Sequence, residues 1–254
     1  MLKSTPLFQL KHGNHICVFY RDQTRLLETL APYVAEALRK SERCFCAQKR
    51  DMIEPLHAAL KSIGVDEKRE INRGALEIRT ENEVYLGGGN FDPAAMMQVL
   101  ETSITDSRKQ GFTGFRFAGE GSWAAEEGRA DQLIEYERMV DAAFEKKPAI
   151  IICQYDTNPF SEKTLKDTLE SHRLALETMA GANHSSLIIR HSDYVVEIVA
   201  DRENPRTKFY YVAQPRGSNE IVGWGAEQSF DDAVRQGESL IRSLTRGKSR
   251  AKPC

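Results

Sequence analysis

The sequence has few of the features that mark secreted, membrane-spanning or nucleic-acid-binding proteins. Its formal net charge is only −2, so no strong overall field draws it to nucleic acid or to an acidic membrane. No apolar run is long enough to cross a bilayer, and the first residues have no apolar signal-peptide core. The five cysteines include no Cys-x-x-Cys pair, and an odd number without a secretory signal predicts a reducing compartment. We therefore expect a cytoplasmic protein that contacts neither membrane nor nucleic acid directly.

The sequence also lacks a phosphate-binding loop between its first predicted strand and its first predicted helix. Residues 15–20 form an apolar run typical of a buried strand, and apolar side chains recur at helical spacing from there to Glu42. Nucleotide-binding proteins join such a strand and helix by a glycine-rich loop that ends in Gly-Lys-Ser or Gly-Lys-Thr. Here residues 20–24 read Tyr-Arg-Asp-Gln-Thr, and Asp22 is placed to cap the helix. We predict the frame of a nucleotide-binding domain without its phosphate chemistry.

Strand-like and helix-like segments alternate along the chain, with further strands predicted at residues 44–48, 75–80, 112–118 and 149–155. This alternation predicts an α/β fold with a mostly parallel central sheet and helices on both faces. A small C-terminal α+β appendage is predicted from the segments beyond Gly181, which are strands at residues 187–189, 194–199, 209–213 and 221–224 and a last helix capped by Ser229.

The predicted organisation has three parts. We expect a domain over residues 11–180, and in one alternative residues 185–200 complete its sheet. A hairpin-plus-helix unit follows over residues 201–246. The last part, residues 247–254, is basic and is predicted to be disordered.

Short polar signals predict where several helices begin. Asp51 and Glu54 have the spacing of a capping box, and Asp92 stands directly before a proline at the first helical position. Ser161 is predicted to cap a helix whose apolar face runs to Leu176. These signals complete a strand-and-helix pattern over the first domain.

Polar and aromatic side chains follow three of the predicted strands, at residues 20–22, 120–123 and 154–156. In parallel α/β sheets ligands bind at the carboxyl ends of the strands. Three segments that meet at one rim therefore predict a ligand site there.

Several of the segments occur together in a characteristic order. They read HICVFYRD, NRGALEIRTENEVYLGGGNFDP, GFRFAGEGSWA, LIEYERMVD and IIICQYDTNPF. Over residues 11–180 this set resembles the MEDS family, the methanogen/methylotroph, DcmR-type sensory domain. The resemblance implies a sensory domain related to RecA/KaiC-like P-loop ATPases that has lost their nucleotide-binding motif, and hence a RecA/KaiC-like three-layer sandwich.

The resemblance also implies ligand, partners and site. The ligand would be a small organic, hydrocarbon-derived molecule, and the partner a histidine kinase or a transcription regulator. The family's characteristic residues would fall on His15, Tyr20, Asp22, Tyr85, Glu120, Trp123, Gln154, Tyr155 and Asp156. Two features depart from the family pattern: Arg21 stands where many members carry an acid, and no recognisable kinase or helix-turn-helix segment follows the domain.

Several of these residues have an ordinary structural interpretation as well. His12 and His15, with Cys17 nearby, lack an evident fourth metal ligand, so a structural role is favoured. Glu120 either binds a ligand or accepts hydrogen bonds from backbone amides of a neighbouring loop. A buried thiol at Cys153 would be inert.

The aromatic residues at the rim also allow two interpretations. Tyr20, Trp123, Tyr155 and Phe160 either line an apolar ligand pocket or pack helices against the sheet. The family resemblance favours the pocket.

The leading hypothesis is a non-enzymatic sensory or regulatory module of signal transduction, with no catalytic residue, metal or cofactor. One alternative is a divergent nucleotide-binding protein or ATPase, for which Arg21, Arg25 and Arg116 are the nearby cations. Another is an interaction scaffold for a kinase or a sigma-factor regulator. Self-association into a homo-oligomer is expected only by analogy with RecA-like proteins.

Overall fold

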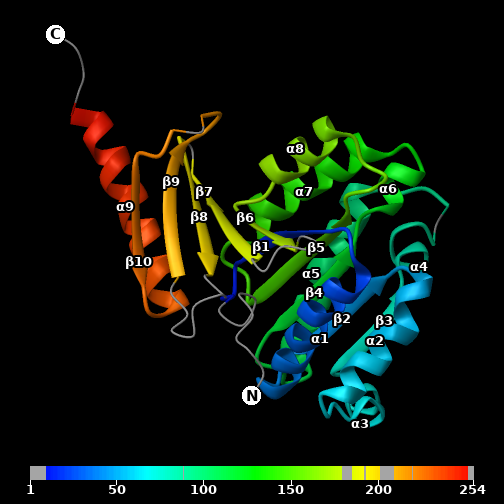
Figure 1. Cartoon of the computed structure of the whole chain (residues 1–254). Coiled ribbons are helices and arrows are strands. Elements are labelled where there is room, and N and C mark those ends of the chain that lie inside the picture. Colours follow the sequence, from blue (N-terminus) through cyan, green and yellow to red (C-terminus); the bar gives the residue numbers. More distant parts are fainter. Residues whose placement is uncertain are drawn as a thin grey trace. The chain divides into compact units, whose positions relative to one another are not determined.

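The computed structural model describes residues 10–87, 89–178, 185–191, 193–200, 209–218 and 220–250. The chain forms two compact units, one that ends at His172 and one that begins at Arg173 (Figure 1). The first unit is therefore shorter than the predicted domain, which extended to residue 180. The strands predicted at residues 187–189 and 194–199 belong to the second unit.

The first unit is built on a parallel sheet. Its described strands are β1 (His15–Tyr20), β2 (Arg43–Gln48), β3 (Leu76–Thr80), β4 (Phe115–Glu120) and β5 (Ala149–Asp156). They lie in the order β1-β5-β4-β2-β3, and every neighbouring pair is parallel. The predicted α/β class with parallel pairing is confirmed, while the RecA/KaiC-like relationship stays a prediction.

Helices cover both faces of this sheet. They are α1 (Gln23–Arg39), α2 (Arg50–Ser62), α3 (Glu67–Asn72), α4 (Glu81–Tyr85), α5 (Pro93–Lys109), α6 (Trp123–Glu126), α7 (Ala130–Phe144) and α8 (Glu162–Glu170). Tyr33 of α1 lies against Arg116, whereas Glu137 of α7 contacts Tyr155. Arg116 is in register with Ile150 on β5, and side chains alternate along a strand, so these two helices cover opposite faces.

Capping hydrogen bonds fix most of the predicted helix starts. Asp22 accepts a hydrogen bond from the Thr24 amide at 2.8 Å, and Asp92 and Ser161 cap α5 and α8 in the same way. The predicted capping box at residues 51–54 is wrong, because α2 begins after Lys49 without a side-chain cap. A complete capping box is found instead at the start of α4.

The helix predicted from Ser161 to residue 176 is too long. It ends at Glu170, and Leu176 lies in a strand, β6 (Leu174–Thr178). A run of leucines at helical spacing fits either structure when it is this short. Strand β4 likewise begins three residues later than the predicted start at 112 and reaches Glu120.

The second unit is an antiparallel meander with one helix. Strands β6, β7 (Ser185–Arg190), β8 (Tyr194–Ala200), β9 (Phe209–Pro215) and β10 (Gly223–Glu227) pair in sequence order, and α9 (Phe230–Arg250) packs on β8, β9 and β10. This confirms the predicted hairpin and last helix. Residues 247–250, predicted to be disordered, belong to α9, and residues 251–254 lie outside the described residues. No helix in the described part of the chain is long and apolar enough to cross a membrane.

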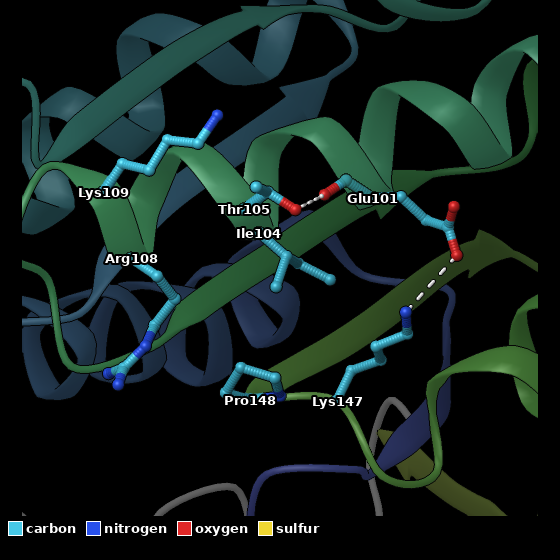
Figure 2. Close-up of a pocket in the computed structure, with 7 residues that line it drawn as sticks. All are labelled: Glu101, Ile104, Thr105, Arg108, Lys109, Lys147 and Pro148. Atoms are coloured by element: carbon cyan, nitrogen blue, oxygen red, sulfur yellow. Dashed lines mark hydrogen bonds and ion pairs between the residues drawn. The ribbon is translucent and has the colours of Figure 1, made fainter.

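A depression of about 460 Å³ opens beside the amino end of β5, at the last turns of α5 (Figure 2). Its basic side chains already have partners: Lys147 lies 3.5 Å from Glu101, and Arg108 donates hydrogen bonds to the carbonyls of Phe112 and Thr113. It lies at the opposite end of the sheet from the predicted ligand rim.

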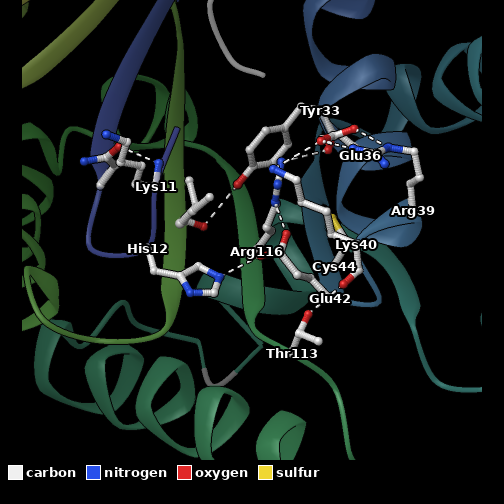
Figure 3. A network of polar contacts seen from close by, with 12 residues as sticks. Lys11, His12, Tyr33, Glu36, Arg39, Lys40, Glu42, Cys44, Thr113 and Arg116 are labelled. Atoms are coloured by element: carbon white, nitrogen blue, oxygen red, sulfur yellow. Dashed lines mark hydrogen bonds and ion pairs between the residues drawn. The ribbon is translucent and has the colours of Figure 1, made fainter. Parts of the chain in front are cut away.

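A buried ion pair holds helix α1 to the amino ends of the strands (Figure 3). Arg116 Nε donates to Glu42 Oε2 at 2.6 Å, and both residues are almost completely buried. The Arg116 guanidinium also lies over the Tyr33 ring and donates to the Tyr33 carbonyl. His12 adds a contact to the other oxygen of Glu42 at 2.6 Å.

We expect Glu42→Ala to lower the free energy of unfolding by about 3–5 kcal/mol, because it leaves the Arg116 charge buried without its partner. Urea denaturation measures this change. The matched control is Arg39→Ala, which breaks the solvent-exposed pair with Glu36 and should leave the unfolding midpoint unchanged. Equal midpoints for Glu42→Ala and wild type would contradict a structural role for the buried pair.

Candidate functional site

All nine residues of the predicted site lie in the first unit, but they do not form one cluster. In the parallel register Tyr20 pairs with Asp156, and Glu120 pairs with Gln154. These side chains share the sheet face covered by α1. Tyr155 lies on the other face, together with His15. The predicted residues therefore divide between the two faces of the sheet.

The first group is centred on the Glu120 carboxylate, at the end of β4. Tyr20 Oη donates to its Oε2 at 2.7 Å, and the Ser122 amide donates to its Oε1 at 2.9 Å. Two roles were considered for Glu120, ligand binding and a hydrogen bond from a backbone amide. The structure contains the second, since the Ser122 amide donates to it. Burial raises the pKa of Glu120 to about 7, although both hydrogen bonds act in the opposite direction. Gln154 beside it is fully buried, and within the part of the chain that the structure describes neither its side-chain oxygen nor its side-chain nitrogen has a hydrogen-bond partner.

The carboxylates of Asp22 and Asp156 accept hydrogen bonds from residues close to them in sequence. Asp22 caps α1 through the Thr24 amide. Asp156 accepts hydrogen bonds from the backbone and the side chain of Asn158, at 3.0 and 2.6 Å. Their carboxylates therefore stabilise the chain directions after β1 and β5.

The second group is an aromatic cluster on the α7 face. It consists of Tyr85, Phe91, Phe117, Trp123 and Tyr136. Tyr85 stacks on Trp123 with ring centroids 5.2 Å apart, and Phe91 meets Trp123 edge-on at 4.8 Å. Trp123 Nε1 and Tyr136 Oη are buried here without a hydrogen-bond partner among the described residues. Two members, Tyr85 and Trp123, were predicted as site residues.

The third group, here called the histidine cluster, consists of His15, Glu137, Cys153 and His172, all buried. Glu137 Oε2 lies 3.0 Å from His15 Nε2 and 3.3 Å from His172 Nε2. Cys153 Sγ lies 3.4 Å from His15 Nε2. These donor atoms are of the kinds that bind transition-metal ions.

Burial and neighbouring side chains set the pKa values within this cluster. Burial alone would raise the pKa of Glu137, but the adjacent imidazoles of His15 and His172 outweigh it and lower this pKa well below its usual range. Burial opposes the charge of His15, yet the Asp141 and Glu137 carboxylates raise its pKa. Burial and the nearby His15 lower the pKa of His172, and burial raises that of Cys153.

Sequence reasoning predicted only one member of the histidine cluster. It grouped His15 with His12 and Cys17, but His12 contacts Glu42 at the amino end of the sheet. The helix predicted from Ser161 to residue 176 would have His172 in its interior, whereas His172 follows the end of α8 at Glu170. The sequence signal for this cluster is Glu137, a carboxylate next to Tyr136 on the apolar side of α7. An acid at such a position is buried and therefore needs hydrogen-bond partners from other segments.

The cations considered for nucleotide binding do not meet at the turn after β1. Arg21 donates to Thr157, and Arg25 pairs with Glu28 on the helix surface. Arg116 is buried at the opposite end of β4, paired with Glu42. The α1 amino terminus, where a phosphate would bind, is capped by Asp22. None of these contacts favours a phosphate ligand.

The geometry defines a parallel α/β domain whose strand ends carry buried polar and aromatic clusters in place of a phosphate-binding loop. Residues 14–173 match the family model described as MEDS, the MEthanogen/methylotroph, DcmR Sensory domain, and the chain belongs to this family. It is also 25% identical over 165 residues to the transcriptional repressor DcmR of Methylorubrum extorquens (strain DSM 6343 / CIP 106787 / DM4). That match covers 64% of this chain and 59% of DcmR, so the chain spans about three fifths of that relative's length. The predicted sensory and regulatory class is thereby supported.

We expect Glu120→Gln to flatten the dependence of stability on pH. The Glu120 pKa is about 7 in the folded chain against 4.5 for the free side chain, so the folded state holds the proton more tightly. The stabilisation that this tighter proton binding gives the folded state is fully present below pH 4.5 and is lost as the pH rises through 7. Between pH 5 and 8 wild type should therefore lose about 2 kcal/mol relative to the variant.

Urea denaturation of both proteins at several pH values measures this difference, and the histidine contributions cancel in the comparison. Glu54→Gln, at an exposed position on α2, serves as the control and should follow wild type. Parallel curves for wild type and Glu120→Gln would show that the Glu120 proton is not held in the folded state.

Proposed function

We propose that this chain is a non-enzymatic sensory module that binds a small, largely apolar organic molecule in the aromatic cluster. A hydrocarbon derivative with one hydrogen-bond acceptor has the required chemistry. The observation that carries the proposal is the pair of buried donors, Trp123 Nε1 and Tyr136 Oη, which have no partner among the surrounding rings. The sensory family to which the chain belongs supports the same reading.

The cluster offers an apolar ligand a surface of rings with two polar groups to orient it, which is the usual composition of a small-molecule site. Burial raises the pKa of Tyr136 well above its usual value, so its hydroxyl stays protonated and able to donate. A buried donor without a partner costs about 1–3 kcal/mol. A ligand acceptor that meets either donor would recover part of this free energy.

Burial also couples binding to movement. Trp123 is only 2% exposed, and the ring centroids around it lie at contact distances of 4.8–5.2 Å. A ligand can therefore enter only if the rings or the helices that carry them rearrange. A site that opens to bind converts ligand binding into a change of shape, which is what a sensor must transmit.

The side chains near the site favour binding over catalysis. Glu120 is held by two hydrogen bonds of its own, and Cys153 is buried with a raised pKa. A thiol of this kind is a poor nucleophile. The nucleotide-binding alternative receives less support, because Asp22 occupies the helix end that a phosphate would need.

We further propose that the signal leaves through protein contacts of the second unit. The similarity to a transcriptional repressor suggests a transcription regulator as the final receiver. Strand β10 is the last in the described order of the second unit, and Trp224 on it is 70% exposed. Ile221, just before β10, is 57% exposed. Exposed apolar side chains on an edge strand are typical of an association surface.

Ligand binding can be followed through Trp123 alone in a Trp224→Phe background, because the chain has two tryptophans. We expect halogenated alkanes, ethers or ketones to change its fluorescence saturably and to raise the melting temperature. At a ligand concentration of 100 Kd the stabilisation should be about 2.7 kcal/mol. Tyr136→Phe should weaken binding roughly tenfold, because it removes one hydrogen bond.

Trp123→Phe, followed by the melting temperature, should have a similar effect, and Trp224→Phe is its matched control. Mg²⁺ with ATP should produce no stabilisation. Stabilisation by ATP together with no response to any organic compound would favour the nucleotide-binding alternative.

We expect the chain to self-associate through Trp224, and Trp224→Ser to reduce the molar mass measured by light scattering after size-exclusion chromatography. The physical reason is loss of the apolar area that a second copy would bury. Val99→Ser, at a position 43% exposed in the first unit, is the control and should retain the wild-type mass. A monomeric wild type would exclude this surface as a self-association site.

A further inference from the structure

The histidine cluster has the donor set and spacing of a metal centre. Its four potential ligand atoms come from β1, α7, β5 and the residue that follows α8 by two positions, and all lie within 4.8 Å of one another. Metal bonds of about 2.0–2.3 Å place the donors of a tetrahedral site about 3.3–3.7 Å apart. Three of the donor separations are 3.0 Å (His15–Glu137), 3.3 Å (Glu137–His172) and 3.4 Å (His15–Cys153). The folded chain thus presents donors close to that spacing.

An outer hydrogen bond turns the lone pair of His172 toward the cluster. His172 Nδ1 lies 2.8 Å from the Thr168 carbonyl, which can only accept, so this nitrogen carries a proton and Nε2 is left with its lone pair. Metal-binding histidines characteristically donate their second nitrogen to a carbonyl or carboxylate in this way. His15 Nδ1 lies 3.5 Å from Asp141 Oδ1, and this nitrogen makes no hydrogen bond within the described residues.

The remaining two ligands are held as well. Tyr155 Oη donates to Glu137 Oε1 at 2.6 Å, which fixes the carboxylate and leaves Oε2 facing the two imidazoles. Cys153 lies two residues earlier on β5, so its thiol points to the same face as Tyr155. Two of the three non-sulfur ligands, Glu137 and His172, therefore have an outer hydrogen bond, and His15 has a carboxylate nearby.

Without a cation, one contact in the cluster is unfavourable. His172 Nε2, with its lone pair, lies 3.3 Å from Glu137 Oε2, which is itself an acceptor, and this nitrogen is buried without a hydrogen bond to any described residue. Protonating His172 as well as His15 would bury two cations whose ring centroids are 4.1 Å apart. A metal ion between the donors removes the conflict, because every lone pair then faces positive charge.

We propose that His15, Glu137, Cys153 and His172 bind one Zn²⁺ ion in a closed, four-coordinate site. Two neutral imidazoles, one carboxylate and one thiolate give a net charge of zero with a divalent ion, which suits complete burial. Nitrogen and sulfur donors select Zn²⁺ over Mg²⁺ or Ca²⁺. Binding releases the Cys153 thiol proton and any second proton on His15 to solvent. With all four positions filled by protein, the ion links β1, β5 and α7 and leaves no open position for a substrate.

The experiment begins with metal analysis of the full chain. We expect about one zinc per chain after purification or after reconstitution of chelator-treated protein with Zn²⁺, and a higher melting temperature for the loaded protein. Replacement by Co²⁺ should give the thiolate-to-cobalt charge-transfer band and the intense visible absorption of a tetrahedral cobalt site. X-ray absorption at the zinc edge should fit one sulfur and three nitrogen or oxygen ligands.

Variants then assign the ligands. Cys153→Ser should abolish the charge-transfer band, and His172→Gln should abolish stoichiometric zinc. The matched control is Cys17→Ser, because Cys17 is buried next to Cys153 in the β1–β5 register but is not among the four ligands. It should keep both zinc and the cobalt spectrum. Tyr155→Phe should weaken zinc binding about 10–100-fold through the loss of an outer hydrogen bond.

Three results would overturn the proposal. One is a wild-type chain that takes up neither Zn²⁺ nor Co²⁺ and shows no change in melting temperature with either ion. Another is equal loss of metal in Cys17→Ser and Cys153→Ser. The third is an absorption spectrum at the zinc edge without sulfur, and this measurement on wild type decides the question even if the Cys153 and His172 variants fail to fold.

Discussion

The first unit depends on one buried carboxylate. Glu137 lies on the side of α7 that faces the sheet. It contacts His15 on β1, Tyr155 on β5 and His172 after α8. A charge removed from water must be met by partners, and here the partners come from segments far apart in sequence. The constraint therefore sets the position of α7 on β1 and β5 and the point at which the chain leaves α8.

The parallel sheet separates the chemistry of the rim into two faces. Because side chains alternate along a strand, Gln154 and Tyr155 lie on opposite sides although they are neighbours in sequence. Gln154 joins Glu120 and Tyr20, while Tyr155 joins the histidine cluster. A rim that looks like one site in the sequence is therefore three environments in the fold, one hydrogen-bonded, one aromatic and one rich in metal-binding donors.

Sequence patterns predicted what depends on local physics and missed what depends on the topology. Apolar runs predict the strands of the first unit. The starts of three helices are predicted by their capping residues, Asp22, Asp92 and Ser161, because a cap is a contact within a few residues. The cluster of Glu137 with His172 joins residues 35 positions apart, and its link to His15 spans 122. No local period encodes such contacts, so only an acid on the apolar side of a helix hinted at them.

Hydrogen-bonding groups that the fold leaves without partners are the best candidates for ligand contacts. Asp22, Asp156 and Glu120 were plausible site residues, but each is engaged in a turn, a cap or a buried hydrogen bond that the fold needs. By contrast, the side chains of Trp123, Tyr136 and Gln154 are buried with polar atoms that nothing in the described chain satisfies. Native proteins rarely retain such groups without a reason, since each lowers stability. In the proposed function a ligand is that reason, and recognition would then lie in the layer between helices and sheet, where binding must disturb the packing that defines the fold.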